Sequence, residues 1–265
     1  MPEGPEVQIM VDSLNRILTN NFITVSILKQ SSIIKNNINI NNIKVEEISR
    51  KGKWIIIEFE NNKMLVIHLG MTGRFSEEAN KNNVLDILIN TSPIKHLYYS
   101  DIRGFGKILE LDKISLESYN PINAIKVDGL KDDIKTIYTR FKELNNNKQE
   151  IKPFLLDYRN ISGIGNIYAS EILYAAKINP YKKVYKLTEE ELLTISYETK
   201  RILEEAYKNG GSTIESFYDA EGRKGNYQEK HNVYGQKNCR HCGSKVVRTE
   251  QKGRSTFYCS NEQQL

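Results

Sequence analysis

The stretch WIIIEFENNKMLVIHL, residues 54–69, decides the first half of the fold. It contains two short runs rich in Ile, Val and aromatic residues, 54–59 and 64–69, with a polar cluster between them. Such runs are typical of β-strands, and polar clusters between them are typical of turns. Similar runs lie at Phe22–Leu28, Val84–Ile89, His96–Tyr99 and Lys107–Leu111. Several short strands at this spacing predict a sandwich or a barrel.

Helical periodicity flanks this β-rich region on both sides. Residues 5–19 carry apolar residues three to four positions apart, which predicts a helix. Beyond about residue 128 the pattern becomes helical again, and the predicted helices are 131–145, 150–157, 167–177, 188–208 and 211–217. The fourth of these begins with a capping-box pattern, Thr188 with Glu191. The chain is therefore predicted to be an α+β multidomain protein.

Composition narrows the class of protein. The 265 residues are 39% hydrophobic, which is enough for one large core or two small ones and excludes a wholly disordered chain. No apolar run approaches the roughly 20 residues of a membrane-spanning helix. The N-terminus, with Pro2, Glu3, Pro5 and Glu6, does not resemble a signal peptide, so we expect an intracellular protein. The net charge of +5 permits a nucleic-acid partner but does not establish one.

The three cysteines, Cys239, Cys242 and Cys259, all lie near the end of the sequence. An intracellular protein seldom forms disulfides, and a C-x-x-C pair followed by a third cysteine is typical of a metal site. Three thiols are one short of the four ligands that a closed zinc site needs. His241 could ligate in principle, but its place inside the C-x-x-C pair is poor for completing the same tetrahedron.

The first residues could also supply a reactive group. Removal of Met1 would leave Pro2 with a free secondary amine, whose pKa near ~8 makes it partly neutral at pH 7. Such an amine can attack a carbonyl-like carbon and form an iminium ion, with Glu3 or Glu6 as general acid or base. The alternative is purely structural: Pro5 suits the first turn of a helix, and Glu6 suits the positive end of its dipole.

The N-terminal residues and five further motifs resemble those of a known family. MPEGPEV (residues 1–7) is similar to the start of the Fpg/Nei family of DNA glycosylase/AP lyases. Further motifs of that family follow in order along nearly the whole chain: KGKW (51–54), HLGMTG (68–73), DIRGFG (101–106), GIGNIYASE (163–171) and RSTFYC (254–259). The motif set resembles the Fpg branch most, although Gly4 is closer to the endonuclease VIII branch.

The resemblance implies an architecture. An N-terminal catalytic β-sandwich led by a helix would occupy residues 1–120, and a hinge would follow at 121–130. A helix–two-turn–helix domain would occupy residues 131–236, with a lesion-capping loop at about 216–233. A zinc-finger-type β-hairpin would end the chain at 237–265.

The resemblance also implies a reaction, the removal of oxidised purines from DNA. Pro2 would attack the sugar C1′ of a nucleotide flipped out of the duplex, displace the base and form a Schiff base. β,δ-Elimination would then cut both flanking phosphate bonds. Glu3 would protonate the sugar ring oxygen, Glu6 would assist proton transfer, and Lys53 would belong to the catalytic set.

The resemblance also implies three groups of DNA-contacting residues and one supporting residue. Phosphates would be bound by Lys53, His68, Asn166 and Arg254, and the hole left by the flipped base would be filled by Met71, Arg103 and Phe105. Glu171 would be a structural or orienting carboxylate, and Arg223, Lys224 and Tyr227 would belong to the lesion loop. Without the resemblance, the ordinary interpretation would be that His68, Met71 and Phe105 belong to the core and that Arg103 lies on the surface.

The metal site departs from the family pattern. The family ends in a second C-x-x-C pair, and here the last position of that pair holds Glu262. Two interpretations follow: a structural zinc ion held by Cys239, Cys242 and Cys259 with Glu262 or water as the fourth ligand, or a weak or absent zinc site.

The expected partner is damaged double-stranded DNA, and the protein is expected to act as a monomer. Alternative functions are an endonuclease VIII-like glycosylase for oxidised pyrimidines, a catalytically inactive relative that only binds damaged DNA, and an unrelated basic ribonucleoprotein. The presence of Pro2, Glu3 and Lys53 argues against an inactive relative, and the ordered motifs argue against the ribonucleoprotein.

Overall fold

The computed structural model describes residues 2–213 and 217–264. It divides into two compact units, one of Met1–Ala124 with Gly210–Gly225 and one of Ile125–Asn209 with Asn226–Leu265. The division after Ala124 falls inside the predicted hinge. The late segment 210–225 lies with the first unit, although the sequence pattern placed it in the helical domain. None of the helices in the described part is long and apolar enough to cross a membrane.

The first unit opens with helix α1 (Gly4–Leu18), as the sequence predicted. Proline in its first turn and a capping box formed by Glu3 and Glu6 fix its start. Its apolar side chains, among them Met10, Leu14 and Leu18, are buried in the core of this unit. The helix packs against strands β2 (Ile43–Lys51) and β3 (Trp54–Phe59).

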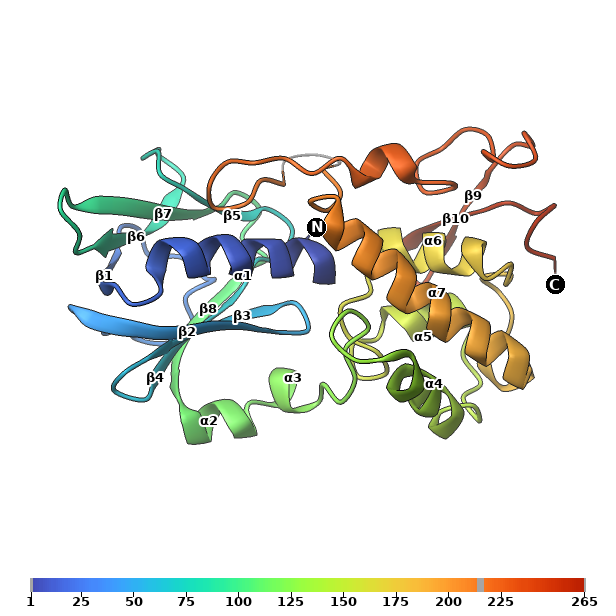
Figure 1. Ribbon diagram of the computed structural model, residues 1–265, viewed down its shortest axis with the longest axis horizontal. Helices are drawn as coiled ribbons and strands as arrows, with labels where there is room; N and C mark the ends of the chain where they lie inside the picture. Colours follow the sequence, from blue (N-terminus) through green and yellow to red (C-terminus); the bar gives the residue numbers. More distant parts are fainter. Residues whose placement is uncertain (1, 214–216, 265) are drawn as a thin grey trace. The chain divides into compact units, whose positions relative to one another are not determined.

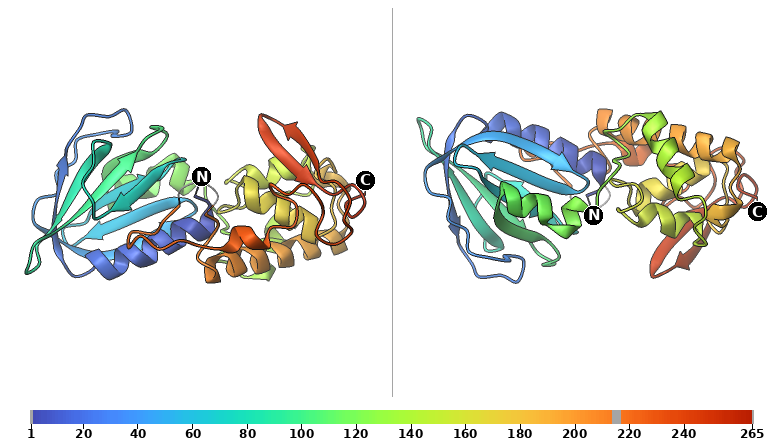
Figure 2. Two further views of the ribbon diagram at one scale, coloured as in Figure 1. Left: turned by 90° about the horizontal axis from the view of Figure 1, so that it is seen from above. Right: turned by 90° about the horizontal axis from the view of Figure 1, so that it is seen from below.

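Eight antiparallel strands form the β-sandwich that the sequence predicted (Figures 1 and 2). They are β1 (Phe22–Ile27), β2 (Ile43–Lys51), β3 (Trp54–Phe59), β4 (Lys63–His68), β5 (Gly73–Ser76), β6 (Asn83–Ile89), β7 (Lys95–Asp101) and β8 (Lys107–Asp112). The order is β5-β7-β6-β1-β2-β3-β4-β8. β1 and β2 pair at only two positions, Phe22 with Lys44 and Ile23 with Ile43, so the sheet changes layer there. β2 and β5 were not predicted.

The second unit is mainly helical (Figure 1). The short helices α2 (Lys113–Ser118) and α3 (Asn120–Asn123) end the first unit's main segment. The helices of the second unit are α4 (Ile134–Glu143), α5 (Ile151–Leu156), α6 (Asn166–Ala175), η1 (Val184–Lys186), α7 (Glu189–Lys208) and η2 (Tyr227–Lys230). Its two strands, β9 (Val247–Gln251) and β10 (Arg254–Tyr258), form a hairpin. The four helices predicted before residue 209 are confirmed within a few residues at each end.

The helix predicted over 211–217 was wrong for 211–213 and 217, the part of that range that the structure describes. Gly210 and Gly211 have φ angles of +75° and +77°, which end α7 in the left-handed region and prevent a continuous helix. The capping box at the start of α7 is confirmed, because Thr188 Oγ1 accepts the Glu191 N–H and Glu191 Oε2 accepts the Thr188 N–H.

Candidate active site and DNA-contacting loops

Pro2 is buried and precedes Glu3, the N-cap of α1, and the side chains of Glu3 and Glu6 are buried as well. The Glu6 carboxylate accepts the backbone N–H of Glu3 at 2.9 Å and that of Ser212 at 2.7 Å. Gly211 makes this second contact possible, since a Cβ there would lie 2.8 Å from Glu6 Oε1. The fold thus holds two carboxylates at the end of the chain where the N-terminal amine would lie.

His68 lies near two lysines at the end of an inner strand of the sheet. It ends β4, between its register partners Trp54 on β3 and Lys107 on β8. Burial, and then the charges of Lys53 and Lys107, lower the pKa of His68 from 6.5 to about 4, so its ring is neutral at pH 7. Nδ1 accepts the Gly70 N–H at 3.1 Å, which leaves the proton on Nε2. The ring can therefore donate a hydrogen bond to an anion that the two lysines attract.

Lys107 was missed by the sequence analysis as a candidate site residue. Its signal was weak: a cation at the first position of a predicted strand, directly after the DIRGFG motif. Its relation to Lys53 and His68 becomes visible only through the pairing of β4 with β8.

The two turns that carry Met71, Arg103 and Phe105 lie against each other. Thr72 Oγ1 donates to Asp101 Oδ1 at 2.5 Å and accepts the Arg103 N–H at 2.9 Å. At Gly70 a Cβ would lie 2.5 Å from the backbone of residues 105 and 106, so the turns pack backbone to backbone.

Phe105 is 56% exposed, and the Arg103 guanidinium lies 5.2 Å from the centre of its ring. An exposed phenylalanine paired with an arginine is not a core residue, and it is available to enter a base stack.

In the second unit, Asn166 begins α6 and its side chain is held at both ends. Its Oδ1 accepts from Lys152 Nζ at 2.7 Å, and its Nδ2 donates to Ser255 Oγ at 3.1 Å. Lys152 Nζ also donates to the Ser255 carbonyl at 2.8 Å. Lys152 is fully buried and ties the start of α6 to the β9–β10 hairpin. Lys152 was not among the predicted site residues, although a lysine within the apolar run 151–156 was a signal.

Arg254 is the first residue of β10 and is exposed. The turn before it, Lys252–Gly253, has φ angles of +47° and +74°, as tight hairpin turns require. Its neighbour Ser255 carries the contacts to Asn166 and Lys152. Two of the expected phosphate ligands, Asn166 and Arg254, are therefore brought together through these bonds.

Glu171 is buried and its carboxylate accepts four hydrogen bonds. Oε2 accepts the N–H of Asn232 at 2.8 Å and its side-chain amide at 3.2 Å. Oε1 accepts the N–H groups of Val233 at 3.0 Å and Tyr234 at 2.8 Å. The carboxylate thus anchors residues 232–234, the segment that precedes Cys239 and Cys242 and, after them, the β9–β10 hairpin.

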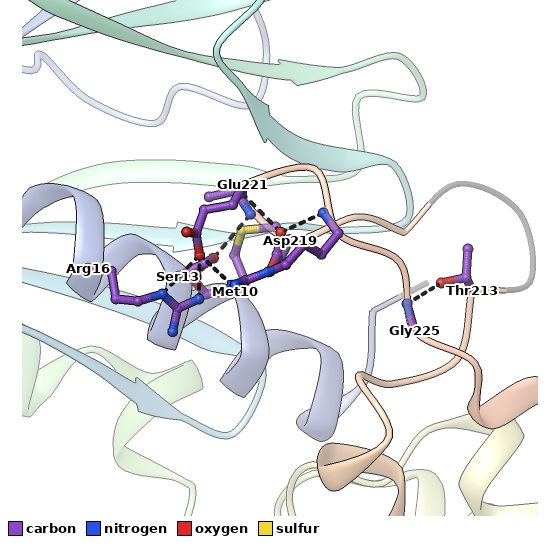
Figure 3. A network of polar contacts seen from close by, with 9 residues as sticks. Met10, Ser13, Arg16, Thr213, Asp219, Glu221 and Gly225 are labelled. Carbon is purple, nitrogen blue, oxygen red and sulfur yellow. Dashed lines mark hydrogen bonds and ion pairs between the residues drawn. The ribbon is translucent and has the colours of Figure 1, made fainter.

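The expected lesion-loop residues lie in different surroundings. Arg223 donates to the carboxylates of Asp219 and Glu221. Figure 3 labels these two acids and Arg16, which also bonds Glu221. The Lys224 ammonium lies 5.2 Å from the ring centre of Tyr218. Tyr227 is instead buried in the core of the second unit, with its ring 6.0 Å from that of Tyr168. Its surroundings are those of a packing residue.

The three cysteines converge as the sequence predicted. Their sulfur atoms lie within 4.8 Å of one another, and a tetrahedral zinc ion with Zn–S bonds of about 2.3 Å would separate them by about 3.8 Å. Burial raises the pKa of Cys239, but hydrogen bonds from the Cys242 N–H and the Tyr174 hydroxyl outweigh it and lower the pKa to about 7. The three sulfur atoms can therefore occupy three of the four ligand positions of a zinc ion.

No fourth His, Cys, Asp or Glu donor joins this group in the part of the chain that the structure describes. Glu262 Oε1 lies 2.8 Å from His241 Nδ1, so its carboxylate faces that imidazole. Ser244 Oγ approaches the sulfurs of Cys242 and Cys259, at 2.9 and 3.2 Å.

Comparisons with known proteins agree with this geometry. Residues 1–108 match the formamidopyrimidine-DNA glycosylase N-terminal domain, and residues 125–218 match the formamidopyrimidine-DNA glycosylase H2TH domain. Curated relatives named formamidopyrimidine-DNA glycosylase include those of Rickettsia bellii, 33% identical over 98% of both chains, and Ureaplasma parvum, 34% identical over 98% of this chain and 99% of the relative.

Solved structures show the same fold. The MutM (Fpg) protein of Thermus thermophilus is 29% identical, with a TM-score of 0.91 over 99% of this chain and 98% of that one. The Lactococcus lactis Fpg in complex with DNA containing an oxidised pyrimidine is 27% identical, with a TM-score of 0.88 over the whole of both chains. The chain therefore belongs to the formamidopyrimidine-DNA glycosylase family.

Proposed function

We propose that this protein is a base-excision repair DNA glycosylase with AP lyase activity, which removes oxidised purines from double-stranded DNA. The observation that carries the proposal is the N-terminus, where Pro2 precedes a capped helix and the buried carboxylates of Glu3 and Glu6 lie beside it. An amine of low pKa next to carboxylic acids is what attack on a sugar carbon requires.

The proposed reaction begins with removal of Met1, which frees the Pro2 amine. Its nitrogen attacks C1′ of the flipped nucleotide, and the C1′–N bond to the base breaks with its electron pair leaving on the base. The proton that the Pro2 nitrogen loses neutralises the departing base. Glu3 donates a proton to the ring oxygen as the sugar opens to the iminium ion. Loss of a C2′ proton then expels the 3′ phosphate, and a second elimination expels the 5′ phosphate. Glu6, held by the Ser212 N–H, assists these proton transfers.

DNA would be bound through phosphates and through the vacated base position. Lys53 and the neutral His68, with Lys107 added to the set, would bind phosphate from the first unit, and Asn166 and Arg254 from the second. Met71, Arg103 and Phe105 would fill the space left by the flipped base, which the exposure of Phe105 supports. The protein would act as a monomer inside the cell.

We further propose that zinc is bound by Cys239, Cys242 and Cys259, with Glu262 or water as the fourth ligand. The ion would be structural and would hold the segment that ends in the hairpin carrying Arg254. Glu262 must turn away from His241 to serve as a ligand.

The test uses the full chain and a labelled duplex with a single 8-oxoguanine. We expect cleavage that leaves phosphate on both sides of a one-nucleotide gap, no cleavage of the matched guanine duplex, and loss of base release in Glu3→Gln. A duplex with an oxidised pyrimidine, run in parallel, tests the endonuclease VIII-like alternative. No cleavage of either damaged duplex would refute the proposed function, and faster cleavage of the pyrimidine duplex would refute the lesion class.

A further inference from the structure

The turn between β2 and β3 carries Lys53, the lysine that is expected to bind phosphate. Lys51 and Trp54 are register partners, so Gly52 and Lys53 alone connect the two strands. Gly52 takes a φ angle of +61°, as the first position of such a tight turn requires. The place of the Lys53 backbone therefore depends on the contacts that hold this turn.

A buried arginine holds the turn and bonds α1 at the same time. Arg50, near the end of β2, is 8% exposed, and its Nη1 donates to the Gly52 carbonyl oxygen at 2.5 Å. Its Nε donates to Gln8 Oε1 on α1 at 2.9 Å. Gln8 Nε2 in turn donates to Asp12 Oδ1 at 2.9 Å, which orients the amide oxygen toward Arg50. Because the guanidinium is planar and rigid, it fixes the residue before Lys53 relative to the helix.

A second attachment fixes where α1 lies along β2, beside which it packs (Figure 1). Asn15 Nδ2 donates to the Ile48 carbonyl oxygen at 2.8 Å, and Asn15 Oδ1 accepts the Ile48 N–H at 3.3 Å. Ile48 lies beyond the two positions where β1 pairs with β2, so Asn15 takes the place of a strand partner there. Asn15 follows Gln8 by seven residues, which puts both side chains on one face of the helix, about 10 Å apart. Two contacts therefore set the register of α1 on β2.

We propose that Arg50 is a positioning residue, which holds Lys53 in place for DNA phosphate relative to the start of α1. The inference rests on the proposed function. Pro2 stands two residues before α1 and Gln8 lies in its second turn, so the bonds from Gln8 through Arg50 to Gly52 join the nucleophile's helix to the lysine's turn by a short path. Arg50 is itself buried, so its effect on DNA binding passes through this turn. Without the guanidinium, the turn can move independently of the helix.

The test measures binding to a duplex that contains a tetrahydrofuran residue, a stable analogue of an abasic site, by fluorescence anisotropy at several salt concentrations. Arg50→Met places an unbranched side chain without donors at this position. It should weaken binding about three- to tenfold in the chain with Lys53 and less than about twofold in Lys53→Ala. It should also reduce the slope of log affinity against log salt by about one, because a displaced lysine no longer releases a counterion. A residue that only stabilises the fold would weaken binding equally in both backgrounds.

The matched control is Lys63→Met, which should leave affinity and slope unchanged. Like Arg50→Met, it removes a cation that donates to a backbone carbonyl of the same unit, here that of Asn39 at 2.7 Å. Gln8→Met is the second variant, for use if Arg50→Met fails to fold. It changes a half-buried side chain and removes only the acceptor on α1, so binding should weaken about threefold, again only in the chain with Lys53.

An equal loss of affinity with and without the Lys53 side chain would overturn the inference. Unchanged affinity and slope in Arg50→Met, or in Gln8→Met if it replaces that variant, would overturn it as well. Wild-type protein that binds the analogue duplex no more tightly than undamaged DNA would instead overturn the proposed function.

Discussion

Replacing Glu171 by Gln probes the anchor between α6 and the cysteine-containing hairpin. The carboxylate accepts three backbone N–H groups and one side-chain amide. A glutamine amide has the same shape but places N–H groups on one side. The cost is smaller if the amide nitrogen takes the place of Oε2. The Asn232 side chain can then turn its own oxygen toward that nitrogen, and only the Asn232 backbone N–H loses its acceptor.

One buried N–H without an acceptor costs about 1–3 kcal/mol, and the hydrogen bonds that remain lose their charged acceptor. We therefore expect Glu171→Gln to lower the free energy of unfolding by about 2–4 kcal/mol, or the melting temperature by about 5–15 °C. Circular dichroism at 222 nm follows the helical unit through this transition.

The control is Glu189→Gln, at a side chain that is 75% exposed and paired with Lys142, where we expect a change below about 0.5 kcal/mol. Equal melting temperatures for Glu171→Gln and Glu189→Gln would contradict this prediction, because the four hydrogen bonds of Glu171 would then contribute nothing measurable to stability.

Three further predictions concern DNA binding, pH and zinc. Lys53→Ala should weaken binding and reduce the slope of log affinity against log salt by about one, measured by anisotropy; an unchanged slope would remove Lys53 from the phosphate contacts. Because the pKa of His68 is lowered from 6.5 to about 4, the unfolded chain binds more protons in this range, and stability should fall by about 2 kcal/mol from pH 7 to pH 5. Urea unfolding should show a smaller fall in His68→Gln, and an equal fall would contradict the assignment. Glu262→Cys should supply a fourth thiolate and slow zinc release to a chelator, and release at the wild-type rate would argue against this position as a ligand.

The sequence predicted the strands and helices whose apolar residues repeat regularly, and it missed those whose pattern is mixed. β2 (Ile43–Lys51) interleaves charged residues with its apolar ones, and β5 (Gly73–Ser76) has only four residues. The helix predicted over 211–217 is wrong for the described residues 211–213 and 217. Gly210 and Gly211 take positive φ angles there, a backbone feature that apolar spacing does not report.

The candidate site was predictable where it lies in short motifs and not where it depends on distant residues. Pro2, Glu3 and the cysteines could be named from local sequence. Lys152, by contrast, holds Asn166, fourteen residues later, and Ser255, 103 residues later, through tertiary contacts that no local pattern reports. The pairing of Arg16 with Glu221 spans 205 residues, and no local pattern encodes it.

Borohydride trapping identifies the nitrogen that attacks the sugar, because it reduces the iminium ion to a stable covalent adduct. The full chain is incubated with the 8-oxoguanine duplex and sodium borohydride, and the reduced covalent adduct is digested and mapped by mass spectrometry. We expect a single adduct on the nitrogen of Pro2, in a chain without Met1. An adduct on a lysine side chain, or base release with no adduct at all, would contradict it.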